Sequence, residues 1–330
     1  MKDSESVNNN IQISPELLQQ LTINQERQQD DEIDLAELWR AIWAGKWIVI
    51  AITSLFAVAS VFYALSLPNI YKSEALLAPA EQESGGLGGM ASQLGGLASL
   101  AGVSLGGRGT DKTALALEIL QSRSFIFSFI ENYKITVPLM ATEEWNAKTN
   151  ELVLDSEIYD SISKTWIRDV SFPFSPKPSK LESFNEFRKR LSVSQDKMSS
   201  MITVSLEFYS PVKAKEWLEL LVRDINEEMR KRDLVEAENS IAYLKEQLKN
   251  NNSVDLNNVI YQLIEEQTKT IMFAKANKEY VMVIIDPPLV PEVKYGPKRM
   301  LIVSFSALLG GFISILIILT SYFRKHRATR

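Results

Sequence analysis

The sequence WIVIAITSLFAVASVFYALSL occupies residues 47–67 and contains no charged side chain. At about 1.5 Å per residue, a helix of this length extends about 32 Å and can cross a hydrocarbon core of about 30 Å. A second uncharged run, MLIVSFSALLGGFISILIILTSYF, occupies residues 300–323 and has basic residues on both sides. Because a buried helix of a soluble protein does not need so long a run without charge, the two runs predict two transmembrane helices.

The composition excludes several classes of function. The chain has 330 residues, 45% hydrophobic and 23% charged, as in an ordinary folded protein. It has no cysteine and a single histidine, His326, which excludes disulfide frameworks, zinc–thiolate sites and most histidine-dependent chemistry. The net charge of −5 argues against a nucleic-acid binder, which needs a dense basic face. We expect no catalytic residue, no cofactor and no metal.

The orientation of the spans follows from the basic residues at their ends. The tail RKHRATR after the second span has four Lys or Arg side chains and no acid, which predicts a cytoplasmic C-terminus. Two spans then place the N-terminus in the cytoplasm as well. Lys294, Lys298 and Arg299 lie on the opposite side, but long translocated loops largely escape this rule. A signal peptide does not fit the first span, because 46 residues with several acids precede it.

The chain divides into six segments by composition. We expect a disordered cytoplasmic extension, an interfacial helix with its Trp residues at headgroup depth, two spans that enclose one periplasmic domain, and a short basic tail. The extension covers residues 1–30, the interfacial helix 31–46 and the first span 47–67. The periplasmic domain covers 68–299, the second span 300–323 and the basic tail 324–330.

Residues 85–109 hold 10 of the 14 glycines of the chain. A phosphate-binding Walker loop requires GxxxxGK[ST], and here two residues separate the last glycine, Gly109, from Lys112. The stretch therefore does not fit a nucleotide site. Its many Leu residues instead favour a mobile apolar loop that packs on a neighbouring subunit or on lipid.

The pattern of apolar residues in the domain predicts an α/β fold. Apolar spacing predicts helices over 112–133 and 181–191, followed by strands over 192–196 and 201–209. Four apolar residues of the second strand should share one face: Ile202, Val204, Leu206 and Phe208. The nearly continuous apolar run 280–286 predicts a strand at the centre of a sheet.

A long helical hairpin is predicted over residues 211–277. No Gly or Pro interrupts the chain from Val212 to Lys249, and this helix would extend almost 60 Å. The stretch 226–233 has a single apolar contact residue, Met229, so the middle of the helix is either solvated or meets polar partners. The fold class is thus an α+β membrane protein, with two transmembrane helices enclosing an α/β base domain and a projecting helical hairpin.

Three stretches resemble the Wzz chain-length determinants, the polysaccharide co-polymerases of bacterial inner membranes. They are DLAELWRAIWAGKW at 34–47, PNIYKSEAL at 68–76 and the proline-rich segment 286–299. In the last of these, Pro288, Pro291 and Pro297 match the proline spacing of the family, while Lys294 stands where another proline is expected.

The resemblance implies a non-catalytic, homo-oligomeric ring that sets the chain length of a surface polysaccharide, such as the O-antigen of lipopolysaccharide. Its expected partners are other copies of itself, the polysaccharide polymerase, the membrane and the growing lipid-linked glycan. Ring contacts would come from the α/β base and the lower half of helix 211–249. The alternative is a component of capsule or exopolysaccharide export that works with a separate tyrosine kinase. A fused kinase is not expected, because seven residues follow the second span.

Two groups of residues are candidates for structural or assembly roles. Closely spaced prolines favour a stiff extended segment, so Pro288, Pro291 and Pro297 either hold the domain at a set height above the bilayer or form a plain linker. Small residues recur at four-residue steps in the second span, which lets helices approach closely. This stripe serves either subunit contacts or the chain's own first span through Ser60 and Ala64. Its members are Ser306, Gly310, Gly311 and Ser314.

Two other classes of protein compete with this interpretation. A two-span sensor needs a cytoplasmic output module, which neither 46 nor 7 residues supplies. A glycan-cleaving enzyme needs a pair of carboxylates at a suitable separation, and spacing alone cannot select a pair among 41 acidic residues.

Overall fold

A computed structural model describes residues 35–80, 108–250 and 253–328, which form two separate units. The predicted extension 1–30 and most of the glycine-rich stretch, residues 85–107, lie outside the described residues. The helices are α2 (Leu35–Ala44), α3 (Lys46–Ser66), α5 (Arg108–Leu120), α6 (Arg123–Asn132), α7 (Thr136–Ala141), α8 (Lys180–Arg190), α9 (Pro211–Asn250), α10 (Val254–Ala276) and α11 (Arg299–Ala328). The strands are β1 (Tyr71–Pro79), β2 (Thr142–Asn146), β3 (Glu151–Leu154), β4 (Tyr159–Asp160), β5 (Thr165–Trp166), β6 (Leu191–Gln195), β7 (Ile202–Phe208) and β8 (Met282–Asp286).

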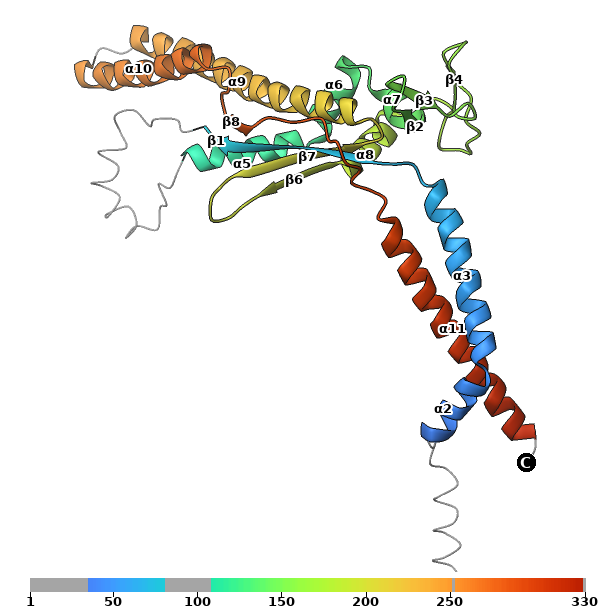
Figure 1. The fold of residues 1–330 in the computed structure, drawn as a ribbon. Coiled ribbons are helices and arrows are strands. Elements are labelled where there is room, and N and C mark those ends of the chain that lie inside the picture. The colour runs from blue at the N-terminus through green and yellow to red at the C-terminus, as the bar shows by residue number, and fades with distance from the viewer. Residues whose placement is uncertain (1–34, 81–107, 251–252, 329–330) are drawn as a thin grey trace, which may run out of the picture. The chain divides into compact units, whose positions relative to one another are not determined.

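The first unit contains α2 and the two long apolar helices α3 and α11, which pack along each other (Figure 1). Two helices, Lys46–Ser66 and Arg299–Arg324, are long and apolar enough to cross a membrane. The helix α3 covers all but the last residue of the predicted first span, 47–67. The helix α11 covers the whole of the predicted second span, 300–323.

The predicted interfacial helix 31–46 is shorter in the structure, where α2 ends at Ala44. A turn at Gly45 separates it from α3, and the Gly45 carbonyl accepts from the Ile48 amide at 2.9 Å. A Cβ atom on Gly45 would lie 2.6 Å from Ile318 Cδ1 of α11, so only glycine fits at this turn without a shift.

The second unit, Leu67–Pro297, is built on a four-stranded antiparallel sheet in the order β6-β7-β1-β8. Helix α9 packs against the two central strands, β1 and β7, and α10 packs back along α9, as Figure 1 shows. The expected face of β7 is confirmed, because all four of its predicted apolar residues are buried in the core. The helical hairpin predicted for 211–277 is also confirmed, with α9 and α10 as its arms.

Two sequence-based predictions were wrong. The helix predicted over 112–133 is two helices bent by 58°, because Ser122 caps α6 by accepting from the Phe125 amide. The strand predicted at the sheet centre, 280–286, is instead the edge strand β8, where Ile284 and Ile285 remain 36% and 53% exposed. Its apolar character therefore does not reflect burial on both faces.

Counted together, the bent pair α5 and α6 is also apolar enough to be one span. The structure assigns it to the core of the second unit instead, because apolar side chains of both helices are buried there. These include Ala116, Leu120, Ile126, Phe129 and Ile130.

The segment between α7 and α8 has no counterpart among the predicted elements. It contains the small hairpins β2–β3 and β4–β5, of which the second has strands of only two residues. The ring of Trp145 on β2 packs edge-on against that of Tyr71 at the start of β1, with 5.5 Å between their centroids.

Candidate functional site

The small-residue stripe of α11 lies against α3. A Cβ atom on Gly310 would be 2.8 Å from the Cβ of Phe56, and Ser314 is fully buried with its hydroxyl donating to the Gly311 carbonyl at 2.6 Å. Gly311 has more room, since its nearest side-chain atom is Thr53 Oγ1 at 3.8 Å from the same ideal position. Ser306 is half-buried on α11. The small residues of the stripe thus pack between α11 and α3 of the same chain.

On α3, the residues suggested to receive this stripe are buried too. Ser60 is 7% and Ala64 2% exposed. The carbonyl of Ala64 accepts from Arg299 Nε at 2.8 Å, which joins the end of α3 to the start of α11. This bond therefore lies where both apolar runs end.

The proline-rich segment runs along the first part of β1, which β8 leaves unpaired, instead of leaving the domain as a loose tether. Pro288 is buried, and the Leu289 carbonyl accepts from the Ser73 hydroxyl of β1 at 2.8 Å. Gly296 then pairs with Ile70 through backbone bonds of 2.9 and 3.1 Å. Because prolines have no N–H to donate, the hydrogen bond from the Ser73 hydroxyl to the Leu289 carbonyl replaces part of the backbone pairing between strands here.

Pro291 is half-buried within this segment, and Pro297 ends it directly after Gly296. The entry and exit of the domain are therefore held side by side by the Ile70–Gly296 pair. Whether the three prolines set the height of the domain over a bilayer stays a prediction.

The polar middle of α9 is explained by two residues on its buried face. Asn226 is 3% exposed and binds the backbone of the segment that enters β8. Its Oδ1 accepts from the amides of Val281 and Met282 at 2.8 and 3.0 Å, and its Nδ2 donates to the Met282 carbonyl at 3.0 Å. The cross-strand neighbour of Met282 is Pro79, which has no N–H, and the Met282 carbonyl accepts from Asn226 Nδ2 instead.

Two turns further along α9, Asp233 joins the helix to both α5 and the loop before β8. Its Oδ2 is 2.5 Å from Lys112 Nζ and accepts from the Tyr280 hydroxyl, also at 2.5 Å. Tyr280 is 1% exposed, so the carboxylate reaches the rim of the core. A partly buried carboxylate with two charge-assisted or hydroxyl partners is well satisfied.

A third polar contact attaches the end of α6 to α9. The Tyr133 hydroxyl donates to Asp224 Oδ1 at 2.9 Å and accepts from Arg223 Nη2 at 2.5 Å. Burial, together with the hydrogen bond to Asp224, raises the pKa of the Tyr133 phenol.

Sequence reasoning did not identify Asn226 and Asp233 as core contacts, although a signal was present. They lie on one helical face with Val222, Met229 and Ala237, all three of which are buried. Polar residues at such positions indicate specific buried partners more often than solvation.

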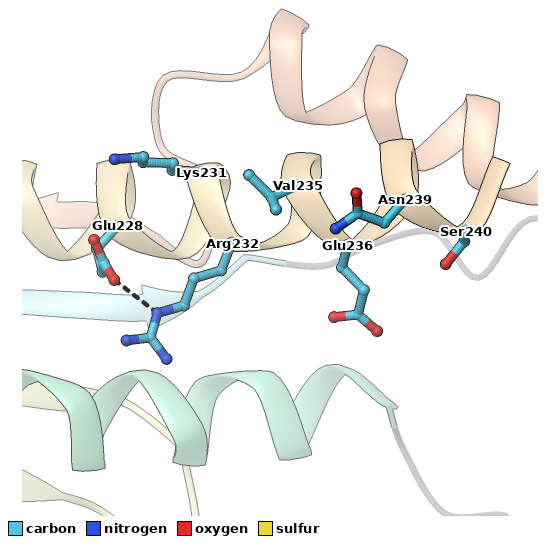
Figure 2. A pocket seen from close by; sticks show the side chains of 7 residues that line it. All are labelled: Glu228, Lys231, Arg232, Val235, Glu236, Asn239 and Ser240. Atoms are coloured by element: carbon cyan, nitrogen blue, oxygen red, sulfur yellow. Dashed lines mark hydrogen bonds and ion pairs between the residues drawn. The ribbon is translucent and has the colours of Figure 1, made fainter. Parts of the chain in front are cut away.

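A hollow of about 510 Å³ lies along α9 beyond these contacts. Figure 2 shows that Glu228, Arg232 and Glu236 extend to one side of the helix, toward α5, whereas Lys231 and Val235 extend away from them. Glu228 and Arg232 pair with each other at 2.7 Å. The side chains do not converge on one point, and among the described residues no group of three or more His, Cys, Asp or Glu side chains is placed to hold a metal ion.

Helix α10 of the hairpin exposes many apolar side chains. On α10, six of them are 41–73% exposed: Val254, Leu256, Val259, Tyr261, Leu263 and Met272. At 100° per residue they fall on two faces, one with Leu256, Val259 and Leu263 and the other with the remaining three. By contrast, the lower half of α9 is occupied by the chain's own core, where Leu218, Leu221 and Ile225 are fully buried.

Comparison with known proteins gives one family. The model of the family described as Wzz, chain length determinant protein, matches residues 31–133, which confirms the resemblance inferred from the sequence. No curated protein matches.

Two solved structures are similar to the chain at low identity. One, described as a full-length bacterial polysaccharide co-polymerase, is 12% identical with a TM-score of 0.37, over 90% of this chain and 99% of that one. The other is a fragment of WzzB, a polysaccharide co-polymerase from Salmonella Typhimurium, 14% identical with a TM-score of 0.30, over 69% of this chain and 100% of that one. The likeness to the family rests on the match of residues 31–133, which is less than half of the chain.

Proposed function

We propose that this chain, whose residues 31–133 belong to the Wzz chain length determinant family, is a non-catalytic co-polymerase that sets the chain length of a bacterial surface polysaccharide. The family match is the observation that carries this function. Two helices able to cross a membrane, enclosing an α/β domain, fit a protein that works beside a membrane-bound polymerase. We propose O-antigen or a related lipid-linked glycan as the polymer.

Control of chain length is tested by electrophoresis of lipopolysaccharide and extracted polysaccharide from a strain that lacks the gene. We expect the clustered length distribution to become a gradual decline while polymerisation continues, and the restored gene to bring the cluster back. Absence of polymer would instead favour a component of synthesis or export. An unchanged pattern in every extracted glycan would overturn the proposed function.

The proposed working form is a homo-oligomeric ring, supported by the exposed faces of α10. Six apolar side chains at these exposures offer roughly 500 Å² of apolar surface, divided between two faces, so each face supplies a part of the roughly 800 Å² per partner in a standard interface. Rings form when one face of a subunit binds a different face of the next. Two apolar faces on one helix suit such a head-to-tail contact.

The ring is tested by a charge placed on α10. In Val259→Glu the new carboxylate would have to be buried without a partner, so we expect smaller assemblies in native mass spectrometry of the full-length chain in detergent. Gln262→Glu adds the same charge at an exposed position between the two apolar faces and should keep the wild-type assembly. Equal assembly of the two variants would exclude this face of α10 from the ring.

For location, we propose the inner membrane with both termini in the cytoplasm and residues 68–299 in the periplasm. The basic tail after the second span supports this orientation, whereas Lys294, Lys298 and Arg299 oppose it. Alkaline phosphatase fused after Ala328 should be inactive if the tail is cytoplasmic, and an active fusion would reverse the topology.

A further inference from the structure

One apolar face of α10 is too small to hold two copies together by itself. It offers roughly 250 Å² of apolar surface, half of the total for the helix. A standard interface buries roughly 800 Å² per partner and is about 60% apolar, which is roughly 500 Å² of apolar surface per partner. A stable ring therefore needs a second apolar contact of about the same size elsewhere in the second unit.

The first surface of suitable size is a turn in the lobe between α7 and α8, residues 142–178. Phe172 is 97% exposed and Phe174 is 56% exposed, on either side of Pro173. The Phe174 amide donates to the Ser171 carbonyl at 3.0 Å, which closes the turn. At these exposures the two rings offer roughly 300 Å² of apolar surface.

Arg168 holds this turn against the start of α8. Its Nε donates to the Pro176 carbonyl at 2.7 Å, and its Nη2 donates to the Ser175 carbonyl at 2.8 Å. The same guanidinium pairs with Glu182, in the first turn of α8, at 2.7 Å. The aromatic rings are therefore presented on a fixed backbone, which lowers the entropic cost of binding and suits an interface anchor.

The second surface is the proline-rich segment beside β1. Its backbone is fixed by the bond from the Ser73 hydroxyl to the Leu289 carbonyl and by the pairing of Gly296 with Ile70. Because prolines interrupt the N–H groups of this edge, a partner would bind its side chains and not extend the sheet. Four of its apolar side chains are 45–77% exposed and together also offer roughly 300 Å²: Leu289, Val290, Val293 and Tyr295.

The two surfaces lie at the same end of the sheet but on different sides of it. The proline-rich segment is bonded to β1 at Ser73 and just before Tyr71, on the side of the edge strand β8. The lobe is joined to the first residue of β1 through Trp145 and Tyr71, and Figure 1 shows it at this end of the sheet. Its turn is bound to α8, which packs on β7 and on the opposite edge strand, β6.

This arrangement suits a head-to-tail contact. Rotation about an axis that runs along the strands moves a copy sideways without changing its level. It can therefore bring the turn of one copy to the proline-rich segment of the next. Unlike surfaces that meet in this way generate rings when the rotation closes.

We propose that the Phe172–Phe174 turn of one copy packs on the proline-rich segment of a second copy, around Val293. The contact rests on the ring proposed above and supplies its second interface. Added to one face of α10, it brings the apolar surface to roughly 550 Å² per partner, as a standard interface requires.

The absence of cysteine allows a direct test with the full-length chain in its membrane. Phe172→Cys and Val293→Cys are made in two copies of the chain that carry different tags, and the copies are expressed together. A short bismaleimide then links the two tags only where the two positions meet between copies. In the matched control, Met198→Cys replaces Phe172→Cys, because Met198 is 98% exposed in the β6–β7 turn at the other end of the sheet.

We expect products that carry both tags from Phe172→Cys with Val293→Cys, and their loss when Met198→Cys takes the place of Phe172→Cys. Equal yields from the two pairs would show random collision and overturn the proposal. So would Phe172→Cys linked mainly to itself, which indicates a symmetric contact. Absence of mixed products in membranes whose native mass spectra show intact assemblies also overturns it, and leaves the ring and chain-length control standing.

Phe172→Asp tests the same contact without a cross-linker. The new carboxylate would be buried without a partner, so we expect smaller assemblies in native mass spectrometry in detergent, whereas Met198→Asp keeps the wild-type assembly. Because the Phe172 side chain is almost wholly exposed, its replacement leaves the core of its own chain intact. Wild-type assembly of Phe172→Asp would contradict the proposal, and the electrophoresis of extracted polysaccharide reports on chain-length control separately.

Discussion

Replacing Asn226 by alanine should destabilise the second unit by removing the link between α9 and β8. The buried amides of Val281 and Met282 and the carbonyl of Met282 would lose the side chain that pairs with them. Each unpaired buried group costs about 1–3 kcal/mol, and water entering the vacated space recovers a part. We therefore expect a loss of about 2–5 kcal/mol, a large share of the stability of a typical domain.

The measurement compares Asn226→Ala with Asn239→Ala on the full-length chain in detergent micelles. Asn239 is an exposed residue of the same helix, so its truncation should change stability by less than about 0.5 kcal/mol. Urea unfolding followed by circular dichroism gives the difference in free energy. Hydrogen exchange of residues 280–286 gives the local effect, which should be faster exchange in the Asn226 variant alone.

Asn226→Asp separates the two sides of the carboxamide. The aspartate keeps an oxygen for the two amides but places a second oxygen against the Met282 carbonyl. Burial raises the pKa of such a carboxyl in the folded state, so its stabilising contribution is present below the unfolded pKa of about 3.9 and is lost as the pH rises. Relative to wild type, the variant should thus recover stability toward pH 4. Equal stability of Asn226→Ala and Asn239→Ala would refute the structural role of Asn226.

Three further changes test other contacts. Gly310→Ala should weaken the pairing of the two spans in a cross-linking assay, because its Cβ would lie 2.8 Å from a phenylalanine of α3, whereas Gly311→Ala should have little effect with 3.8 Å available. Ser73→Ala should cost about 1 kcal/mol and speed proteolysis of the proline-rich segment, since the Leu289 carbonyl loses its donor. Burial raises the pKa of Tyr133, so its contribution to the free energy of unfolding should be present below about pH 10 and fall as the pH rises through the folded-state pKa. Unfolding curves measured over a series of pH values should show this dependence in the wild type and not in Tyr133→Phe.

The spans and the hairpin could be predicted because their signals are local. An uncharged run of 21 residues and a 38-residue run without Gly or Pro, from Val212 to Lys249, leave few alternatives for the backbone. The turn at Gly45 and the bend at Ser122 were missed, because apolar periodicity continues across both and one residue decides each break.

The partners of the polar residues of α9 could not be predicted for a different reason. Asn226 bonds to backbone atoms 55 and 56 residues away, and no pattern along the chain encodes that pairing. In the lobe at 142–178, the hairpin β4–β5 was missed because strands of two residues have no measurable alternation. The proline spacing was recognised, but its use as an edge of the sheet depends on Ser73, more than 200 residues earlier.

Helix α9 has two halves with different sources of stability. From Pro211 to Met229 it is buried in the core, whereas beyond Asp233 it packs mainly on α10, whose outer faces are apolar and exposed. A pair of helices buries only one face of each, and helices of this length are marginal when alone in water. If neighbouring copies cover α10, part of the stability of the hairpin comes from assembly and depends on concentration. Dilution should then increase hydrogen exchange in 254–276 before it affects β1 and β7, whose partners all belong to their own chain.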